Sequence, residues 1–156
     1  MKRIKGLSWL LVGLLALLAI LPLTPAATTE KVYHVPIEKE VEKGLLAFLE
    51  RAFSEAKENE AEAIILEIHT PGGFVDAADD IGKLIDESGI RVIAFINSKA
   101  HSAGAFIALH ADEIYMTKNG TIGAAGVITG DGNAASEKAQ SAWIANMKAA
   151  ASANGL

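Results

Sequence analysis

A serine lies at the junction between a predicted buried strand and a predicted helix of small residues. Ser102 follows the apolar run 92–96 by a short turn and is followed directly by Ala103, Gly104 and Ala105. Small neighbours allow a substrate to approach closely, and the N-terminus of a helix favours a developing negative charge. Ser102 is therefore a candidate nucleophile. Serine is also a preferred helix N-cap residue, so a purely structural role is the alternative.

A second candidate segment contains Gly72 and Gly73, which follow another predicted buried strand at 63–68. Glycines have no side chain, so they leave backbone N–H groups open to a ligand. Two aligned N–H groups can form an oxyanion hole, which stabilises the negative charge of an acyl-transfer intermediate. A Pro-Gly-Gly sequence that only turns the chain is the alternative.

A nucleophile in this chain has to be an oxygen or a nitrogen. The chain contains no cysteine, which excludes thiolate zinc sites and a cysteine nucleophile. A serine needs a base, and the histidines on offer are His34, His69, His101 and His110. His101 adjoins Ser102, where consecutive side chains normally diverge. Lys138, flanked by alanines in a predicted helix, acts as a base only where burial lowers its pKa, and otherwise it is a solvated surface lysine.

The elements that would position these residues alternate between strands and helices. Apolar runs bounded by turn signals predict strands, and apolar residues at steps of three and four predict helices. The predicted strands are 32–37, 63–68, 92–96 and 113–116, with short β segments at 121–123 and 127–129, and the predicted helices are 42–58, 76–88, 103–110 and about 136–153. Pro36 is expected to end the first strand, and turns are expected at 70–73 and 98–102. The alternation predicts an α/β fold with a parallel sheet, in which the strand 63–68 is covered on both faces.

The N-terminus carries the features of an export signal. Three basic residues precede the uncharged apolar segment 7–23, and small residues surround Ala26. This order fits a signal peptide cleaved near Ala26 or an uncleaved membrane anchor, followed by one exported domain at 27–156. Removing residues 1–26 removes three basic residues and no acidic one, so the remaining 130 residues carry a net charge of −8. Such an acidic domain is not expected to bind nucleic acid, because it has no surplus of basic residues to neutralise the phosphates.

The motifs together resemble one known family. The Pro-Gly-Gly segment, the Ser-Ala-Gly segment and a lysine 36 residues after Ser102 are similar to those of the NfeD family of membrane-bound serine proteases of the Clp class. The resemblance covers essentially the whole of 27–156. The matching segments are 32–37, 42–52, 67–75, 101–109, 111–116, 120–124 and 138–147. The combination is specific, although each motif alone is not.

The resemblance implies a Ser-Lys dyad, with Ser102 as the nucleophile and Lys138 as the general base. It also implies that the N–H groups of Gly73 and Ala103 form the oxyanion hole, with Gly72 shaping the loop. The implied fold is the Clp protease/crotonase-like spiral of ββα units with mostly parallel strands. No metal and no other cofactor is expected. Family members continue with more of the protease domain, membrane helices and a small β-barrel, so we expect the exported domain to be truncated at its C-terminus.

The residues expected to contact the substrate are apolar side chains and glycines: Phe74, Phe106, Gly123, Gly126 and Val127. Exposed backbone between the two glycines offers pairing with an extended peptide by strand addition. The apolar side chains would then select hydrophobic segments. The alternative for each apolar side chain is that it packs in the core.

These expectations describe a membrane-associated serine endopeptidase on the extracytoplasmic side of the cell membrane. Its substrates would be hydrophobic segments of membrane-associated proteins, and we expect a homo-oligomer, at least a dimer. The alternative that the resemblance implies is a non-catalytic membrane scaffold for a partner of the stomatin or flotillin type. An acyl-CoA hydratase or isomerase would need catalytic carboxylates near the glycine turns and would not explain the export signal.

Overall fold

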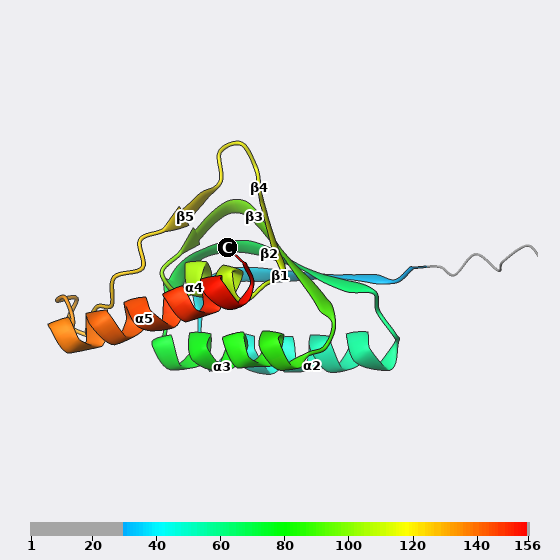
Figure 1. Ribbon diagram of the computed structural model, residues 1–156, viewed down its shortest axis with the longest axis horizontal. Coiled ribbons are helices and arrows are strands. Elements are labelled where there is room, and N and C mark those ends of the chain that lie inside the picture. Colours follow the sequence, from blue (N-terminus) through cyan, green and yellow to red (C-terminus); the bar gives the residue numbers. More distant parts are fainter. Residues whose placement is uncertain (1–29, 156) are drawn as a thin grey trace, which may run out of the picture.

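A parallel sheet organises the part of the chain that the structure describes (Figure 1). The computed structural model describes residues 30–155, and the predicted export segment 1–26 lies outside them. The strands are β1 (Val32–Val41), β2 (Ala63–Gly73), β3 (Arg91–His101), β4 (Glu113–Met116) and β5 (Thr121–Gly123). The first four lie side by side in chain order, β5 pairs with the end of β3, and every pair is parallel. The predicted α/β fold with a parallel sheet is confirmed.

The helices gather on one face of this sheet (Figure 1). They are α2 (Lys43–Glu58), α3 (Val75–Glu87), α4 (Ala103–Leu109) and α5 (Glu137–Ala153). Helix α4 packs on β2 and β3, α3 lies against α4, α2 lies against α3 and β1, and α5 contacts α4. Within residues 30–155, no helix combines the length and the hydropathy needed to cross a membrane.

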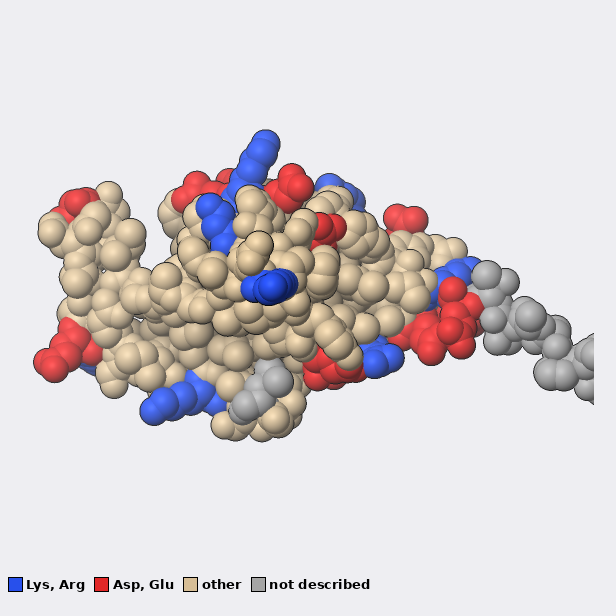
Figure 2. Space-filling model, turned by 90° about the horizontal axis from the view of Figure 1, so that it is seen from above, with Lys and Arg blue, Asp and Glu red and all other residues tan. Residues whose placement is uncertain are grey.

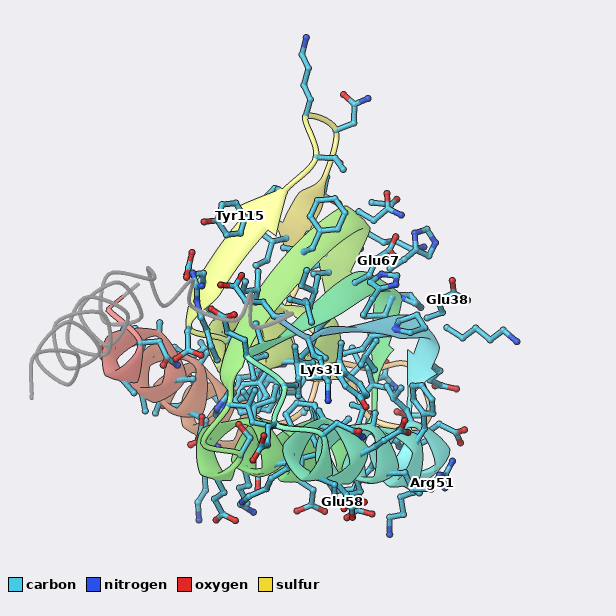
Figure 3. The ribbon with its side chains drawn as sticks, turned by 90° about the vertical axis from the view of Figure 1, so that its right-hand side faces the viewer. Lys31, Glu38, Arg51, Glu58, Glu67 and Tyr115 are labelled. Atoms are coloured by element: carbon cyan, nitrogen blue, oxygen red, sulfur yellow. The ribbon has the colours of Figure 1, made fainter. Side chains whose placement is uncertain are left out.

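The sheet buries one face and leaves the other open. Every second side chain of β2 is fully or almost fully buried against the helices, through Ile64, Leu66, Ile68 and Thr70. On the opposite face, Glu67 and Tyr115 point away from the helical layer (Figure 3). Glu67 accepts hydrogen bonds there from His34 at 2.6 Å and Asn97 at 2.5 Å. The expectation that strand 63–68 is covered on both faces is therefore wrong for the described part of the chain.

Three strands run further than the sequence predicts. β1 continues through Pro36, because it lies at the edge of the described sheet and one of its sides needs no hydrogen-bond donors. β2 continues through the expected turn at 70–73, where Gly72 and Gly73 pair with β1. β3 continues to His101 by pairing with β5. Tertiary pairing thus overrides the local turn signals of proline, glycine and serine, and it aligns the ends of β2 and β3.

Candidate active site

Ser102 occupies a strained backbone position between β3 and α4. Its φ of 51° and ψ of −118° lie where residues other than glycine are uncommon. Such a conformation costs of order 1–3 kcal/mol and persists only where the surrounding structure imposes it. The side chain of Ser102 makes no capping hydrogen bond to α4. Helix capping, the structural alternative, therefore does not account for this serine.

The backbone around Ser102 is held on both sides. The Ser102 N–H donates to the Gly123 carbonyl at 2.8 Å, and the Ser102 carbonyl accepts from the N–H groups of Ala105 and Phe106 at 3.0 and 3.2 Å. The N–H of Ala103, at the start of α4, has no acceptor within its own helix. It has no other hydrogen-bond partner among residues 30–155. This N–H is free to bind an oxygen beside Ser102.

Strand β2 brings its glycine pair against the serine. A Cβ atom on Gly72 would lie 2.6 Å from Ser102 Cβ, and the φ of Gly72 is 111°, so this position requires glycine. Gly73 meets β1 on its other side, where a Cβ would lie 2.1 Å from the Val41 carbonyl oxygen. The Phe74 N–H donates to that oxygen at 2.8 Å. Because successive N–H groups of an extended chain point in opposite directions, the Gly73 N–H points away from β1, toward the side of Ser102.

Thr70 is a residue of this region that the sequence analysis did not single out. It is fully buried, its hydroxyl donates to the Lys39 carbonyl, and the same hydroxyl accepts from the Gly72 N–H at 3.1 Å. Its methyl group packs against Gly104 of α4, where an added Cβ would lie 2.4 Å from Thr70 Cγ2. Buried and exposed side chains alternate along β2, and this alternation places Thr70 on the core-facing side. The two-residue period of apolar positions was the signal available in the sequence.

Lys138 is not joined to Ser102. It is exposed in the first turn of α5, and no hydrogen bond links these two described side chains. The first turns of α5 project beyond the end of the sheet (Figure 1). Seen from above, a notch opens on one side of this end of the molecule, and below the notch the surface continues into the main body (Figure 2). The geometry within the described residues thus shows no contact that would test the expected dyad.

Gln140 fastens the chain before α5 to that helix. Its side chain accepts from the Val127 N–H at 2.9 Å and donates to the Val127 carbonyl at 2.6 Å. A bridge between Ile128 and Ala134 closes the intervening loop. In contrast, the backbone of residues 124–126 makes no hydrogen bond within the described chain. We call residues 124–138 the Lys138 segment. It consists of residues 124–126, whose backbone makes no hydrogen bond within residues 30–155, then a loop that is hydrogen-bonded to α5 through Gln140, and then the first two residues of α5.

The residues expected to contact substrate fall into different environments. Phe74 is 57% exposed directly after the glycine pair. Gly123 precedes the free backbone stretch and Gly126 ends it, whereas Val127 is half-buried and has its backbone bonded to α5. The expectation for Phe106 is wrong. Its side chain is 2% exposed and fills the space between the small residues of α4 and Trp143 of α5, with 4.5 Å between ring centroids.

None of the histidines bonds to Ser102 within the described residues. Three of them pair with other side chains, at distances of 2.6–2.9 Å. These pairs are His34 with Glu67, His101 with Thr121, and His110 with Asp86. Across residues 30–155, no group of three histidine or carboxylate side chains is placed to hold a metal ion.

Two known proteins are similar to this chain in sequence. It is 50% identical to the membrane protein NfeD1b of Bacillus subtilis (strain 168) over 156 residues, which cover 99% of this chain and 36% of that protein. It is 34% identical to the membrane-bound protease PH1510 of Pyrococcus horikoshii over 110 residues, which cover 69% of this chain and 25% of that protein. The chain thus spans well under half the length of either relative.

Two solved structures of 1510-N, described as a membrane-bound stomatin-specific protease, share the fold. A lysine-to-alanine mutant in complex with a substrate peptide matches with a TM-score of 0.75 and 32% identity, over 79% of this chain and 60% of that chain. A serine-to-alanine mutant matches with a TM-score of 0.74 and 31% identity, over 80% of this chain and 64% of that chain. The predicted Clp-protease-like class of fold is confirmed.

The family resemblance predicted from the motifs is also confirmed. Residues 31–156 match the family described as NfeD1b, N-terminal domain. This range contains Ser102, Lys138 and both glycines of the β2 end. The chain belongs to the NfeD1b N-terminal domain family.

Proposed function

We propose that residues 27–156 form a serine endopeptidase domain that acts at the membrane. In this proposal Ser102 is the nucleophile and Lys138 is the general base. The observation that carries it is the backbone of Ser102, which is strained, has no capping side chain and adjoins the free N–H of Ala103. Strain of this kind gathers at functional sites, because a purely structural residue there would be replaced by glycine at a gain in stability.

Each residue then has a defined step. Ser102 Oγ attacks the peptide carbonyl while Lys138 Nζ takes the hydroxyl proton, which it later returns to the leaving amine. The oxyanion accepts hydrogen bonds from the N–H groups of Gly73 and Ala103. Water then hydrolyses the acyl-enzyme. Lys138 Nζ has to come within about 2.6–3.2 Å of Ser102 Oγ for these steps.

The substrate is proposed to be a hydrophobic segment of a membrane-associated protein. The free backbone of residues 124–126 can pair with an extended peptide, and exposed Phe74 lies beside the glycine pair. The relative 1510-N is described as specific for stomatin, which supports a stomatin-type partner for this chain. We further propose an extracytoplasmic location and a homo-oligomer, at least a dimer, in line with the export signal and the family.

A second candidate function is a non-catalytic scaffold that binds the same kind of partner. The observation that favours it is the exposure of Lys138, which makes no hydrogen bond to Ser102 within the described residues. A scaffold would keep the fold and the open backbone stretch for binding but would need no base near the serine.

A peptide cleavage assay with the full-length protein tests the peptidase proposal. Wild type is expected to cleave hydrophobic peptides and to cleave acidic peptides poorly, because the exported domain carries a net charge of −8. Ser102→Ala should abolish cleavage. Lys138→Arg should be nearly as damaging as Lys138→Ala, because arginine keeps the charge but does not release its proton.

Lys148→Arg is the matched control, since Lys148 is another exposed lysine of α5. It should leave turnover unchanged. Because Lys138 is exposed, its variants should change the free energy of unfolding by no more than about 0.5 kcal/mol. An active Lys138→Arg protein would exclude Lys138 as the base. A wild type without Ser102-dependent cleavage of any peptide would favour the scaffold.

A further inference from the structure

One buried side chain contacts three backbone segments around the glycine pair. Thr70 Oγ1 donates to the Lys39 carbonyl of β1 and accepts from the Gly72 N–H at 3.1 Å. Thr70 is fully buried, with none of its surface accessible to solvent. Its methyl group contacts the N-terminal turn of α4 at Gly104.

The two strands that the Thr70 hydroxyl bonds to, β1 and β2, both have a shift in their pairing register near Thr70. The register of β1 against β2 shifts between Glu38 and Glu40, and Lys39 inside that shift has a φ of 61°. The register of β2 against β3 shifts between Ile68 and Thr70. Such irregularities leave backbone groups without regular ladder partners. The Thr70 hydroxyl supplies a partner to one group from each strand.

This bonding fixes the approach of Gly72 to Ser102. The Gly72 N–H is held by Thr70, while an added Cβ on the opposite side of Gly72 would lie 3.0 Å from the His101 carbonyl oxygen and 2.6 Å from Ser102 Cβ. The next N–H along the chain belongs to Gly73 and points toward the side of Ser102. A change in the Gly72 position therefore moves the Gly73 N–H relative to the serine.

We infer that Thr70 is a positioning residue that sets the Gly73 N–H against Ser102, through its hydroxyl to Gly72. The inference rests on the proposed peptidase function and adds a residue to it. Thr70 acts in two ways: its hydroxyl fixes the glycine pair, and its methyl group fixes the depth of α4, which carries Ser102 at its start. The hydroxyl is the part that bears on the oxyanion.

Two near-isosteric variants separate the two parts of the side chain. Thr70→Val keeps the methyl contact with Gly104 and removes the hydroxyl, whereas Thr70→Ser keeps the hydroxyl and removes the methyl. In the full-length protein, Thr70→Val should lower kcat for a hydrophobic peptide by about 10–100-fold, because a displaced oxyanion donor acts on the transition state. KM should change by less than about threefold, since uniform substrate binding is untouched. Thr70→Ser should keep kcat within about threefold of wild type, since its hydroxyl still holds Gly72.

Thr117→Val is the matched control. It removes a similar hydroxyl-to-carbonyl bond, from Thr117 to the Asn97 carbonyl at 2.8 Å, in the connection between β4 and β5. It should leave kcat unchanged. Amide exchange of Gly72 should accelerate in Thr70→Val and stay slow in Thr70→Ser, which reports the positioning bond without relying on turnover.

The outcomes separate the inference from the function on which it rests. A wild type without Ser102-dependent turnover overturns both. If the wild type is active and a folded Thr70→Val protein has a normal kcat, only the role of Thr70 is overturned. Where Thr70→Val does not fold, Thr70→Ser decides: retained kcat with a protected Gly72 amide supports the inference, and lost kcat in a folded protein contradicts it.

Discussion

The two halves of the expected dyad lie in opposite kinds of structure. Around Ser102 the chain is packed to contact, and a Cβ added to Gly72, Gly73 or Gly104 would lie only 2.1–2.6 Å from neighbouring atoms. In the Lys138 segment, a Cβ added to Gly126 or Gly130 would meet nothing within 4 Å. Ser102, the proposed nucleophile, thus lies in a tightly packed region, while Lys138, the proposed base, lies in an open one. The difference indicates that substitutions around Ser102 should cost more stability than matched substitutions in the Lys138 segment.

The largest expected difference between the two regions is in how much a glycine-to-alanine substitution lowers the free energy of unfolding. Gly73→Ala should destabilise the protein by about 3 kcal/mol, because its new methyl group would overlap the backbone of β1 at Val41. Gly126→Ala, the matched change in the Lys138 segment, should stay within about 0.5 kcal/mol of wild type. Urea unfolding measures both. Equal losses at the two positions would contradict the contrast.

A smaller effect is expected from relieving the strain at the nucleophile. Ser102→Gly should raise the free energy of unfolding by about 1 kcal/mol, because glycine adopts the backbone angles of Ser102 at little cost. The same variant should have no peptidase activity. Ser141→Gly, an exposed position within α5, should instead lower stability by about 0.5 kcal/mol. Thermal unfolding of the two variants decides, and a loss of stability in Ser102→Gly would show that Ser102 is not strained.

The smallest effect concerns the tip of the Lys138 segment at acidic pH. The Thr129 hydroxyl and the Asn133 side chain donate to the Asp131 carboxylate and hold its pKa at about 2, below the ordinary 3.8. Because the pKa is lowered in the folded loop, the stabilisation is complete above pH 3.8 and is lost as the pH falls toward 2. Carboxyl chemical shifts should therefore give Asp131 a midpoint near pH 2.

Thr129→Val should move that midpoint upward, toward 3.8, because it removes the main donor to the carboxylate. Amide exchange around Ser102 should not change over the same pH range as a result of this variant. A wild-type midpoint near 3.8 would mean that the tip of the segment is not held by these bonds.

The sequence predicted the elements better than their ends. The strand at 113–116 has the predicted bounds, and the helix predicted at 42–58 is α2, because burial of Leu49, Phe53 and Ala56 follows the helical period. The turns expected at 70–73 and 98–102 are strand instead. Their turn signals are local, whereas the pairing that extends β2 and β3 comes from β1 and β5, which are distant in sequence.

The candidate site shows the same limit. Residue types identified the serine and the glycine pair, since nucleophiles and open N–H groups have recognisable neighbours. Phe106 was assigned to the substrate groove because composition does not reveal which side of a short helix faces Trp143. Thr70 was overlooked because its role arises from contacts with Lys39 and Gly104, which only the folded sheet brings together.

Covalent labelling with a fluorophosphonate probe tests the central claim, that Ser102 is a nucleophile. The full-length protein is treated with the probe, and its intact mass and modified peptide are determined for wild type, Ser102→Ala and the matched control Ser98→Ala at the end of β3. We expect one equivalent of label on Ser102 in wild type and in Ser98→Ala, and none in Ser102→Ala. An unlabelled wild type, or label that persists in Ser102→Ala, would contradict the claim.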